Sequence, residues 1–568
     1  MAKAAPFSFK NSLIIAKSNP YKIVYNWTSS FALSGFMSIY LNTDNQAFCR
    51  ILRDGYVDKS ASLSFFNSKL FAESGFICVS RPRRFGKSIN AKMLNAYYSK
   101  GANSKDIFDK LNIAKDPSYL ENLNKYNVIY LDMQSFKDEP SLNKTYLDDI
   151  NESVVKELKE AFSSVLKDTD INLLPDAILK IYQETKEQFI FIIDEWDYVF
   201  RTFPTNQVLQ AGYIDLLRQL FKSEPNSQSV ILAYITGILP IKKYKTESAL
   251  NNFDEYTMLN PMELASSLGF TKTEVKALCD KNGVDFYKTC DWYDGYRLGS
   301  EDIFNPKSIM MLMRTHEFES YWTQTGSFDT VSNYINMNFE GLKDDIISLV
   351  NGNSLTDIDV SDFSNDLTSF HNKNSVIIYL IHLGYLAYSK ENNKKLVYIP
   401  NEELRQELIR SVNNSQWNEY IQAIDNSKQL LAKTVFEKDP YYVAKAIERE
   451  HQKLSSIISY NLENDLCITV NNAYTAASAY YFKPKRELPL GKGFADIVYI
   501  PKPEYSDVYP ALVIELKWDH KVKTAIDQIK RQEYCKSLEE YTGNILMVGI
   551  SYEKDSKKHT CLIEEYSK

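Results

Sequence analysis

The sequence has few of the residues that hold small secreted or zinc-bound proteins together. Its seven cysteines are spread over 568 residues, with no CxxC pair and no histidine at zinc-finger spacing. This pattern excludes a disulfide framework and a structural zinc site, and it is typical of reduced thiols in a cytoplasmic protein. Long apolar runs are also missing. The N-terminal run FALSGFMSIYL at 31–41 is too short to span a bilayer and starts too late for a signal peptide.

An excess of positive charge is missing as well. The chain has 66 Lys and Arg against 73 Asp and Glu, a net charge of −7 and a pI near 5.7. This balance excludes a protein that coats nucleic acid by bulk charge, so any nucleic-acid contact must be local. At this length the chain exceeds one hydrophobic core, and we expect about two to four domains. Residues 1–45 lack periodicity and predict an N-terminal extension.

Short apolar runs separated by helical sequence are the main pattern in the first half of the chain. They lie at 76–79, 128–136, 189–197 and 230–237. Runs with little polar alternation, spaced by helices, predict a parallel sheet covered by helices on both faces. The first run leads directly into a Gly-Lys-Ser turn and a helical stretch at 88–100. This strand, turn and helix predict an α/β domain of the P-loop NTPase type over 46–260.

The segment RPRRFGKS at 81–88 matches the end of the phosphate-loop pattern GxxxxGK[ST], but Arg81 replaces its first glycine. In such a loop the lysine reaches the β- and γ-phosphates and the next hydroxyl binds Mg²⁺, so we assign these roles to Lys87 and Ser88. Arg83 and Arg84 add positive potential. The predicted nucleotide-binding loop comprises Arg83, Arg84, Phe85, Gly86, Lys87 and Ser88. A basic surface turn that contains Gly-Lys-Ser by chance remains the alternative.

Two acids end the apolar run at 189–197. A carboxylate at the end of a neighbouring parallel strand can bind Mg²⁺, a role that we assign to Asp194. The next acid can orient the attacking water, which makes Glu195 a catalytic candidate. Thr236, at the end of the following strand, is a candidate sensor of the γ-phosphate, although Thr-Gly at a strand end is also common turn chemistry. Together with the loop, these residues predict ATP and Mg²⁺ as cofactors.

A series of motifs links this region to a known family. YVDKS, RPRRFGKS, VIYLD, IDEWD, LNNF, LGFT, YDGYRLG, FNPKSI and YWTQTG follow in order between residues 54 and 326. Together they resemble the AAA-ATPase-like family of prokaryotic proteins. Members of that family carry RPRRFGKS where other proteins have the first-glycine pattern, so the resemblance implies an ATPase and accounts for Arg81. The family's usual IDEYD reads IDEWD here, which keeps both acids.

The middle region, 261–410, is predicted to be a helical lid followed by a winged-helix-like module. The stretch 374–409 reads as a helix, a β-hairpin turning at 391–393, and a second helix. Such a module can hold duplex nucleic acid through phosphate contacts. The candidate phosphate-binding cations are Lys390, Lys394 and Lys395. Winged helices also serve as plain contacts between domains or subunits, and this alternative stays open.

The last region, 411–568, begins with helices and returns to strands at 494–500, 511–518 and 544–552, with a helix from 522 to about 538. Asp496 enters one strand, and Glu515 and Lys517 lie two apart on the next, so they share a face. A hairpin partner would bring Asp496 beside them. Two carboxylates and a lysine on one face suit metal-assisted phosphodiester cleavage, in which Asp496 and Glu515 hold Mg²⁺ and Lys517 steadies the nucleophile.

The sequence around these residues resembles the PD-(D/E)XK nuclease superfamily in the segments RELPLGKGFADI, VIELKW and AIDQIKRQEY. The resemblance implies that Asp496, Glu515 and Lys517 form the catalytic core and that Gln528, on the following helix, faces the scissile phosphate. It also suggests that Glu448 or Glu450 supplies a helical acid. A relative that kept the fold and lost cleavage is the alternative.

These observations predict an ATP-hydrolysing P-loop protein with a C-terminal Mg²⁺-dependent nuclease, in which the ATP state gates cleavage or binding of nucleic acid. The expected partners are ATP, a nucleic acid of unknown type and, by family resemblance, further copies of the chain. The alternative is a regulatory ATPase switch whose nuclease-like domain is an inert binding module. The first hypothesis needs both candidate sites to be assembled; the second needs only the nucleotide site.

Overall fold

The structure is a computed structural model that describes residues 38–138, 144–241, 243–244, 247–248, 250–322, 339, 341–350, 352–356, 358–360, 370, 372–391, 394–413, 418–454, 463–482, 484–490, 492–538 and 543–566. The predicted N-terminal extension lies almost entirely outside the described residues. No helix in the described ranges is long and apolar enough to cross a membrane. No disulfide joins the seven cysteines, all of which lie among the described residues.

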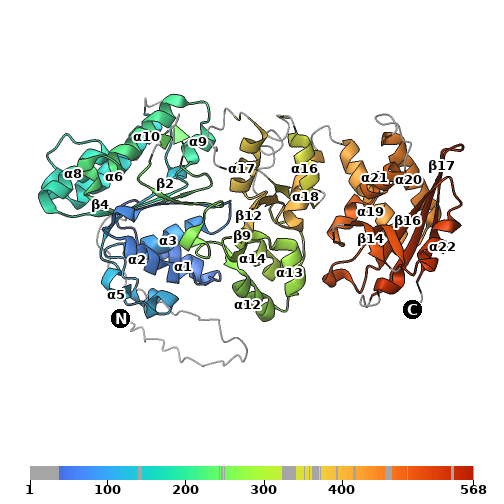
Figure 1. The fold of residues 1–568 in the computed structure, drawn as a ribbon. Coiled ribbons are helices and arrows are strands. Elements are labelled where there is room, and N and C mark those ends of the chain that lie inside the picture. Colours follow the sequence, from blue (N-terminus) through green and yellow to red (C-terminus); the bar gives the residue numbers. More distant parts are fainter. Residues whose placement is uncertain are drawn as a thin grey trace, which may run out of the picture. The chain divides into compact units, whose positions relative to one another are not determined.

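The first domain is built on a five-stranded sheet with the order β2-β3-β4-β1-β7 (Figure 1). Its strands are β1 (Phe76–Ser80), β2 (Asn127–Asp132), β3 (Phe189–Asp194), β4 (Val230–Gly237) and β7 (Asp254–Tyr256). Every pairing in this sheet is parallel, which confirms the predicted parallel sheet. Two predicted runs extend past their strands: the chain leaves β2 in a 3₁₀ turn at Met133–Ser135 and leaves β3 at Glu195, whose φ is +54°.

Helices cover both faces of this sheet, as predicted. One face carries α1 (Gln46–Arg53), α2 (Leu63–Lys69) and α3 (Lys87–Tyr98), and the other carries α6 (Tyr146–Ala161), α8 (Leu174–Thr185) and α10 (Gln207–Phe221) (Figure 1). Successive residues of β3 alternate between the two cores: Ile190 and Ile192 pack on the α3 side, whereas Phe191 and Ile193 pack on the α6 side. Because both faces are buried, β3 is apolar from Phe189 to Ile193 and its first polar residue is Asp194 at the carboxyl end.

Short elements complete this domain: α4 (Lys105–Phe108), α5 (Tyr119–Asn122), α7 (Ser163–Leu166), α9 (Tyr198–Thr202), α11 (Glu224–Ser227), β5 (Lys243–Tyr244) and β6 (Glu247–Ser248). Side chains cap the starts of α6 and α10. At the start of α6, the Thr145 side chain and the Asp148 side chain each accept a hydrogen bond from the other's backbone N–H. This capping box fixes the helix start and satisfies two otherwise unpaired donors.

The middle region contains a three-stranded antiparallel sheet that the sequence did not predict. Its order is β8-β10-β9, with β8 (Phe270–Thr271), β10 (Glu301–Phe304) and β9 (Tyr296–Leu298). Four helices accompany it: α12 (Lys272–Asn282), α13 (Phe286–Tyr293), α14 (Pro306–Thr315) and α16 (Leu342–Val350). Strands of two to four residues are too short to show a period in the sequence.

The helix, hairpin and second helix predicted at 374–409 are confirmed. They are α17 (Lys373–Leu383), the antiparallel pair β12 (Ala387–Glu391) and β13 (Lys394–Tyr398), and α18 (Glu402–Asn413). The short strand β11 (Leu355–Thr356) adds to β13. Of the predicted turn, residues 392–393 lie outside the described residues. The assignment of this module to the winged-helix class stays a prediction.

The last domain has a mixed five-stranded sheet with the order β14-β15-β16-β17-β18, in which β16 and β17 are parallel. Its strands are β14 (Lys485–Leu490), β15 (Gly493–Tyr499), β16 (Ala511–Trp518), β17 (Ile545–Glu553) and β18 (Lys558–Glu565). Its helices are α19 (Asn418–Val435), α20 (Pro440–Leu454), α21 (Glu463–Ala473) and α22 (Lys523–Arg531). Side chains of α19, α20 and α21 cover one face and those of α22 cover the other. The edge strands β14 and β18 were not predicted.

The predicted helix from 522 to about 538 was too long. α22 ends at Arg531, Glu533 has a φ of +55°, and a 3₁₀ turn at Cys535–Leu538 follows. A residue with a positive φ cannot continue a right-handed helix. The turn brings Tyr534 back over the sheet, which matters for the site below.

Candidate functional site

The loop between β1 and α3 has the strand, turn and helix context of a phosphate-binding loop. Gly86 lies directly before α3 with a φ of +90°, and a Cβ at this position would meet no atom within 4 Å. Glycine is therefore favoured here by the backbone conformation and not by a shortage of space. Arg84 also has a positive φ, of +66°. Because α3 begins at Lys87, its first N–H groups and its dipole face the loop, an arrangement that favours anions.

Arg81 does not occupy the place of a flexible glycine. The φ of Arg81 is not positive, and its side chain is fully buried. Its guanidinium donates to three backbone carbonyls: Nη1 to Ser80 at 2.9 Å and Tyr256 at 2.8 Å, and Nη2 to Leu264 at 3.1 Å. Burial lowers the pKa of Arg81 to about 10. Arg81 therefore fastens the start of the loop to β7 and to the segment after it.

Lys87 lies at the wall of a cavity of about 930 Å³. The six predicted loop residues line this cavity together with Glu195: Arg83, Arg84, Phe85, Gly86, Lys87 and Ser88. The Lys87 ammonium donates to the carbonyl oxygen of Pro82 at 3.0 Å. Burial lowers the pKa of Lys87, against the neighbouring charge of Glu195, which raises it. The cavity is large enough for a nucleotide and carries a buried cation at the loop.

Phe85 does more than line the cavity. Its ring is fully buried, and it meets Tyr296 of the middle region edge to face at 5.1 Å between centroids. Its carbonyl oxygen accepts from the Gly269 N–H at 2.9 Å. At Gly269 a Cβ would lie 2.3 Å from Ile303, so the close approach of these segments requires glycine. The end of the loop is therefore fastened to the β8-β10-β9 sheet.

Ser88 and Asp194 lie together at the carboxyl end of β3, as predicted. Burial raises the pKa of Asp194 to about 6, while a hydrogen bond from the Ser88 hydroxyl lowers it. The Tyr130 hydroxyl also approaches the Asp194 carboxylate, at 3.5 Å, and the Glu195 N–H donates to it at 3.1 Å. A hydroxyl and a carboxylate side by side next to a lysine are the ligands that a Mg²⁺–phosphate group uses.

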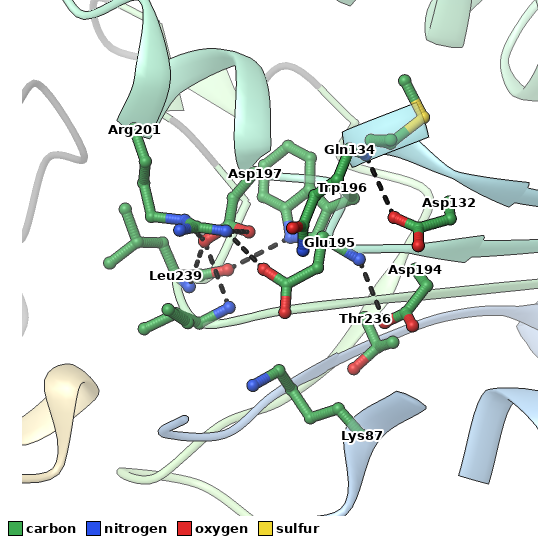
Figure 2. Close-up of polar contacts among 12 residues, drawn as sticks. Lys87, Asp132, Gln134, Asp194, Glu195, Trp196, Asp197, Arg201, Thr236 and Leu239 are labelled. Atoms are coloured by element: carbon green, nitrogen blue, oxygen red, sulfur yellow. Dashed lines mark hydrogen bonds and ion pairs between the residues drawn. The ribbon is translucent and has the colours of Figure 1, made fainter. Parts of the chain in front are cut away.

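Glu195 is part of an ion-pair network that the sequence did not predict (Figure 2). Arg201 of α9 donates through Nη2 to Glu195 and through Nε to Asp197 at 3.0 Å. Asp197 is 1% exposed and also accepts from the N–H groups of Ile238 at 3.1 Å and Leu239 at 2.9 Å. The spacing of Asp197 and Arg201, four residues apart directly after the acids, was the signal that could have revealed this network.

Thr236 lies in the sheet next to these acids, but its side chain is fully buried. Its hydroxyl donates to the carbonyl oxygen of Val79 in β1 at 2.8 Å, and Thr236 does not line the cavity described above. The hydroxyl therefore contributes to the pairing of β4 with β1. Its role as a γ-phosphate sensor stays a prediction.

The second candidate site lies on the α22 face of the last sheet. The Lys517 ammonium pairs with Glu515 at 3.0 Å, and Glu515 is 1% exposed. The Asp496 carboxylate accepts from the Leu516 N–H at 2.7 Å, which brings it to the strand that carries the other two. In register with Glu515 on β17 is Gly549, where a Cβ would lie 3.0 Å from Ala525 of α22. The structure thus brings the predicted triad together.

Gln528 reaches this site through Tyr534, a residue that the sequence did not single out. Gln528 Nε2 donates to the Tyr534 hydroxyl at 3.4 Å, and this hydroxyl donates to the carbonyl oxygen of Phe494 at 2.7 Å. Burial raises the pKa of Tyr534, Gln528 lowers it, and the charges of Glu515 and Asp496 raise it further. Tyr534 therefore faces the carboxylate pair and connects α22 to the strand that carries Asp496.

One of the two suggested helical acids is not part of this site. Glu448 pairs with Lys445 at 2.9 Å and accepts a backbone hydrogen bond from His559 of β18. Two strands, β16 and β17, separate β18 from β15, and α20 packs on the face opposite α22. Of the two suggested helical acids, Glu448 therefore lies on the opposite face of the sheet from this site, and the suggestion of Glu450 stays a prediction.

The predicted phosphate-binding lysines lie on the β12–β13 hairpin. Lys390 is exposed, Lys395 is half-buried, and the side chain of Lys394 lies outside the described set. Lys390 and Lys395 are direct partners in the antiparallel register. Their contact with nucleic acid stays a prediction.

Both sites offer oxygen ligands in pairs. Within the described ranges, no three His, Cys, Asp or Glu side chains gather into a group that could hold a metal ion. Mg²⁺ keeps several waters and is usually held by one or two carboxylates together with substrate phosphates. Ser88 with Asp194, and Asp496 with Glu515, are donor sets that fit Mg²⁺ on these terms.

Comparison with known proteins assigns both regions. Residues 44–246 match the family described as Predicted AAA-ATPase, and residues 469–561 match the PD-(D/E)XK nuclease superfamily. An uncharacterized protein in the vnfD 5′ region of Azotobacter chroococcum mcd 1 is 24% identical over 299 residues, which cover 50% of this chain and 53% of that protein. The chain thus spans about half the length of this curated relative. The ORC2 protein of Aeropyrum pernix, solved in ADPNP–ADP complexes, aligns with 67% of this chain and 93% of its own at 12% identity and a TM-score of 0.27.

Proposed function

We propose a function from the premise that this chain carries a AAA-ATPase-like domain and, at its C-terminal end, a PD-(D/E)XK nuclease superfamily domain. The chain hydrolyses ATP in the Lys87 cavity, and the nucleotide state controls the cleavage of nucleic acid at Asp496, Glu515 and Lys517. The observation that carries this proposal is the assembly of both sites from distant segments: Lys87 and Ser88 meet Asp194 and Glu195, and Asp496 meets Glu515 and Lys517.

In the nucleotide site the backbone N–H groups before α3 hold the phosphates, and Lys87 exchanges the Pro82 carbonyl for phosphate oxygens. Arg83 and Arg84, which line the same cavity, add positive charge. Ser88 and Asp194 hold Mg²⁺, which neutralises charge on the phosphates when it is bound. Glu195 orients the attacking water, and the partly enclosed cavity limits competing water.

In the nuclease-like site the Asp496 and Glu515 carboxylates hold Mg²⁺, which polarises the scissile phosphate when it is bound. Lys517 orients the nucleophile and offsets the charge that develops on the phosphate. Gln528 and Tyr534 fix the position of the strand that carries Asp496. The substrate is nucleic acid, and further copies of the chain are the expected assembly partners.

One observation favours a second candidate, a regulatory ATPase switch with an inert nuclease-like domain. Glu515 is almost fully buried and pairs with Lys517 of its own strand, so both groups already satisfy each other's charge. A pair of this kind can persist in a domain that binds nucleic acid or protein without cleaving it.

The test is cleavage of circular DNA, linear DNA and RNA by the purified chain in Mg²⁺ or Mn²⁺, with and without ATP. Lys517→Ala should abolish cutting, and Lys87→Ala should abolish ATP hydrolysis and change the rate of cutting. Lys521→Ala, an exposed lysine near the nuclease-like site, and Lys92→Ala, on the same helix as Lys87, are the matched controls. ATP hydrolysis that depends on Lys87, without cutting of any substrate, would favour the switch. If neither activity is found, the proposal is wrong.

A further inference from the structure

Arg201 stands out among the cations of the nucleotide cavity because it belongs to neither the loop nor a family motif quoted above. It lies on the short helix α9 directly after the two acids, and its side chain is 15% exposed. It lines the same cavity as Lys87 and Glu195. The charged groups that act on the pKa of Lys87 include Glu195 and Arg201, so Arg201 lies at the phosphate end of the cavity.

The guanidinium of Arg201 lies between the carboxylates of Asp197 and Glu195, and its Nη2 contacts both of them (Figure 2). Nε and Nη2 contact Asp197, at 3.0 and 3.3 Å, and Asp197 is itself held by two backbone N–H groups after β4. Gly237 permits this packing, because a Cβ there would lie 2.5 Å from the Asp197 carboxylate. Asp197 therefore holds Arg201 through Nε, whatever second partner Nη2 binds.

The other partner of Arg201 is Glu195, the residue that orients water in the proposed hydrolysis. A carboxylate oxygen that accepts from a guanidinium has fewer lone pairs left to accept a hydrogen bond from a water molecule. Glu195 also has a φ of +54°, so its backbone is held in a conformation that costs free energy for a side chain of this kind. In this structure, therefore, the Glu195 carboxylate lies at the cavity but is paired with Arg201.

We propose that Arg201 senses the γ-phosphate from within the same chain. When ATP is bound, Nη2 of Arg201 exchanges Glu195 for an oxygen of the γ-phosphate, while Nε stays on Asp197. Glu195 is then released to orient water. With ADP, which has no γ-phosphate, Arg201 stays paired with Glu195. This inference rests on the proposed ATPase function and gives that site its regulation.

The chemistry favours this exchange. A terminal phosphate carries more negative charge than a carboxylate and presents several oxygens to the planar guanidinium fork. The exchange breaks one ion pair and forms another, so the low dielectric of the cavity does not leave a cation unpaired. Arg201 thereby couples the presence of the γ-phosphate to the availability of Glu195.

The test compares the affinity of the full chain for ADP and for a non-hydrolysable ATP analogue, by displacement of a fluorescent nucleotide. Arg201→Ala should weaken binding of the ATP analogue about tenfold or more and leave ADP within about twofold. Arg201→Lys keeps the charge but loses the fork, and it should also lower the preference for the analogue. Arg218→Ala, which removes an exposed arginine of α10 paired with Asp215, is the matched control and should change neither affinity.

Glu195→Gln gives a second, independent readout. It removes the charge that competes for Arg201, so the ATP analogue should bind several-fold more tightly while hydrolysis falls. In the Arg201→Ala background the same change should have no effect on affinity, which a double-mutant cycle measures directly.

A purely structural Arg201 would give a different result. Its loss would lower the melting temperature and weaken ADP and the ATP analogue equally, or would change neither affinity, and either outcome overturns the proposal. Failure of the underlying ATPase function looks different again: the wild-type chain would bind no nucleotide, or Lys87→Ala would bind it as well as wild type.

Discussion

The two candidate sites use a lysine in opposite ways. Lys87 lies in a cavity, with its ammonium on the backbone carbonyl of Pro82 and with a lowered pKa due to burial. Lys517 lies on the face of a sheet, and its ammonium donates to the carboxylate of Glu515 and to the backbone carbonyl of Leu516, each at 3.0 Å. A backbone carbonyl is a neutral partner that an incoming phosphate displaces readily, whereas a carboxylate partner must be given another cation first. A phosphate that reaches Lys87 would thus displace a neutral partner, whereas one that reaches Lys517 would compete with a carboxylate.

The largest effect is expected from Arg81→Gly, which restores the first glycine of the usual phosphate-loop pattern beside Lys87. If the loop needs Arg81 as a fastening, the change should lower the free energy of unfolding by about 3 kcal/mol, because three carbonyls lose their donor and a cavity opens. Calorimetry of the full chain should show a lower melting temperature for the transition that ATP shifts. Arg81→Lys should be intermediate, since it keeps the charge without the fork. Unchanged stability with tighter ATP binding would show that the arginine merely replaces a glycine.

A second prediction concerns the pH dependence of the free energy of unfolding, through Glu403 of α18. Burial raises the pKa of Glu403 to about 7, against a hydrogen bond from Ser308 of α14 that lowers it; Glu407 raises it. The ring of Tyr293 and the Tyr321 backbone also face this carboxyl. Because the folded chain holds this proton more tightly than the unfolded chain, the stability it provides is fully present below about pH 4.5 and is lost as the pH rises to about 7.

Glu403→Gln keeps a neutral group at this position at every pH. Relative to wild type, it should therefore gain about 2 kcal/mol of stability between pH 5 and pH 7.5, seen as a change in the difference between the two melting temperatures. Glu402→Gln, on the same helix and paired with Arg405, is the control and should show no such change. A difference between wild type and Glu403→Gln that stays constant across this range would contradict the prediction.

The smallest effect is expected at Tyr534. Tyr534→Phe removes the hydroxyl that joins Gln528 to the strand of Asp496, which should cost about 1 kcal/mol and slow cleavage about fivefold. Tyr499→Phe removes a buried hydroxyl from the same strand, where it contacts Asn471 and packs in the core on the opposite face. It should cost similar stability without slowing cleavage. Equal effects on cleavage would show that Tyr534 has no special link to the carboxylate pair.

The sequence was most informative where a strand is buried on both sides. Apolar runs in the sequence predicted β1, β3, β4 and β16. The candidate acids were then found because they lie at or near the ends of such runs. The edge strands β14 and β18 were missed because each is covered less evenly. Arg81 was interpreted only as a changed loop entry, because its three acceptors are backbone carbonyls, which no residue type reveals. Tyr534 was missed for a related reason, because its role depends on a contact between segments that meet only after folding. Asp197 and Arg201 were missed although their spacing was visible in the sequence.

The fastening of the phosphate loop at both ends has a mechanical consequence. Arg81 joins its start to the parallel sheet, and Phe85 joins its end to the sheet of the middle region. A segment clamped at two points cannot change its curvature without pulling on at least one of them. A change in the shape of the loop is therefore felt at one or both of the sheets to which it is fastened.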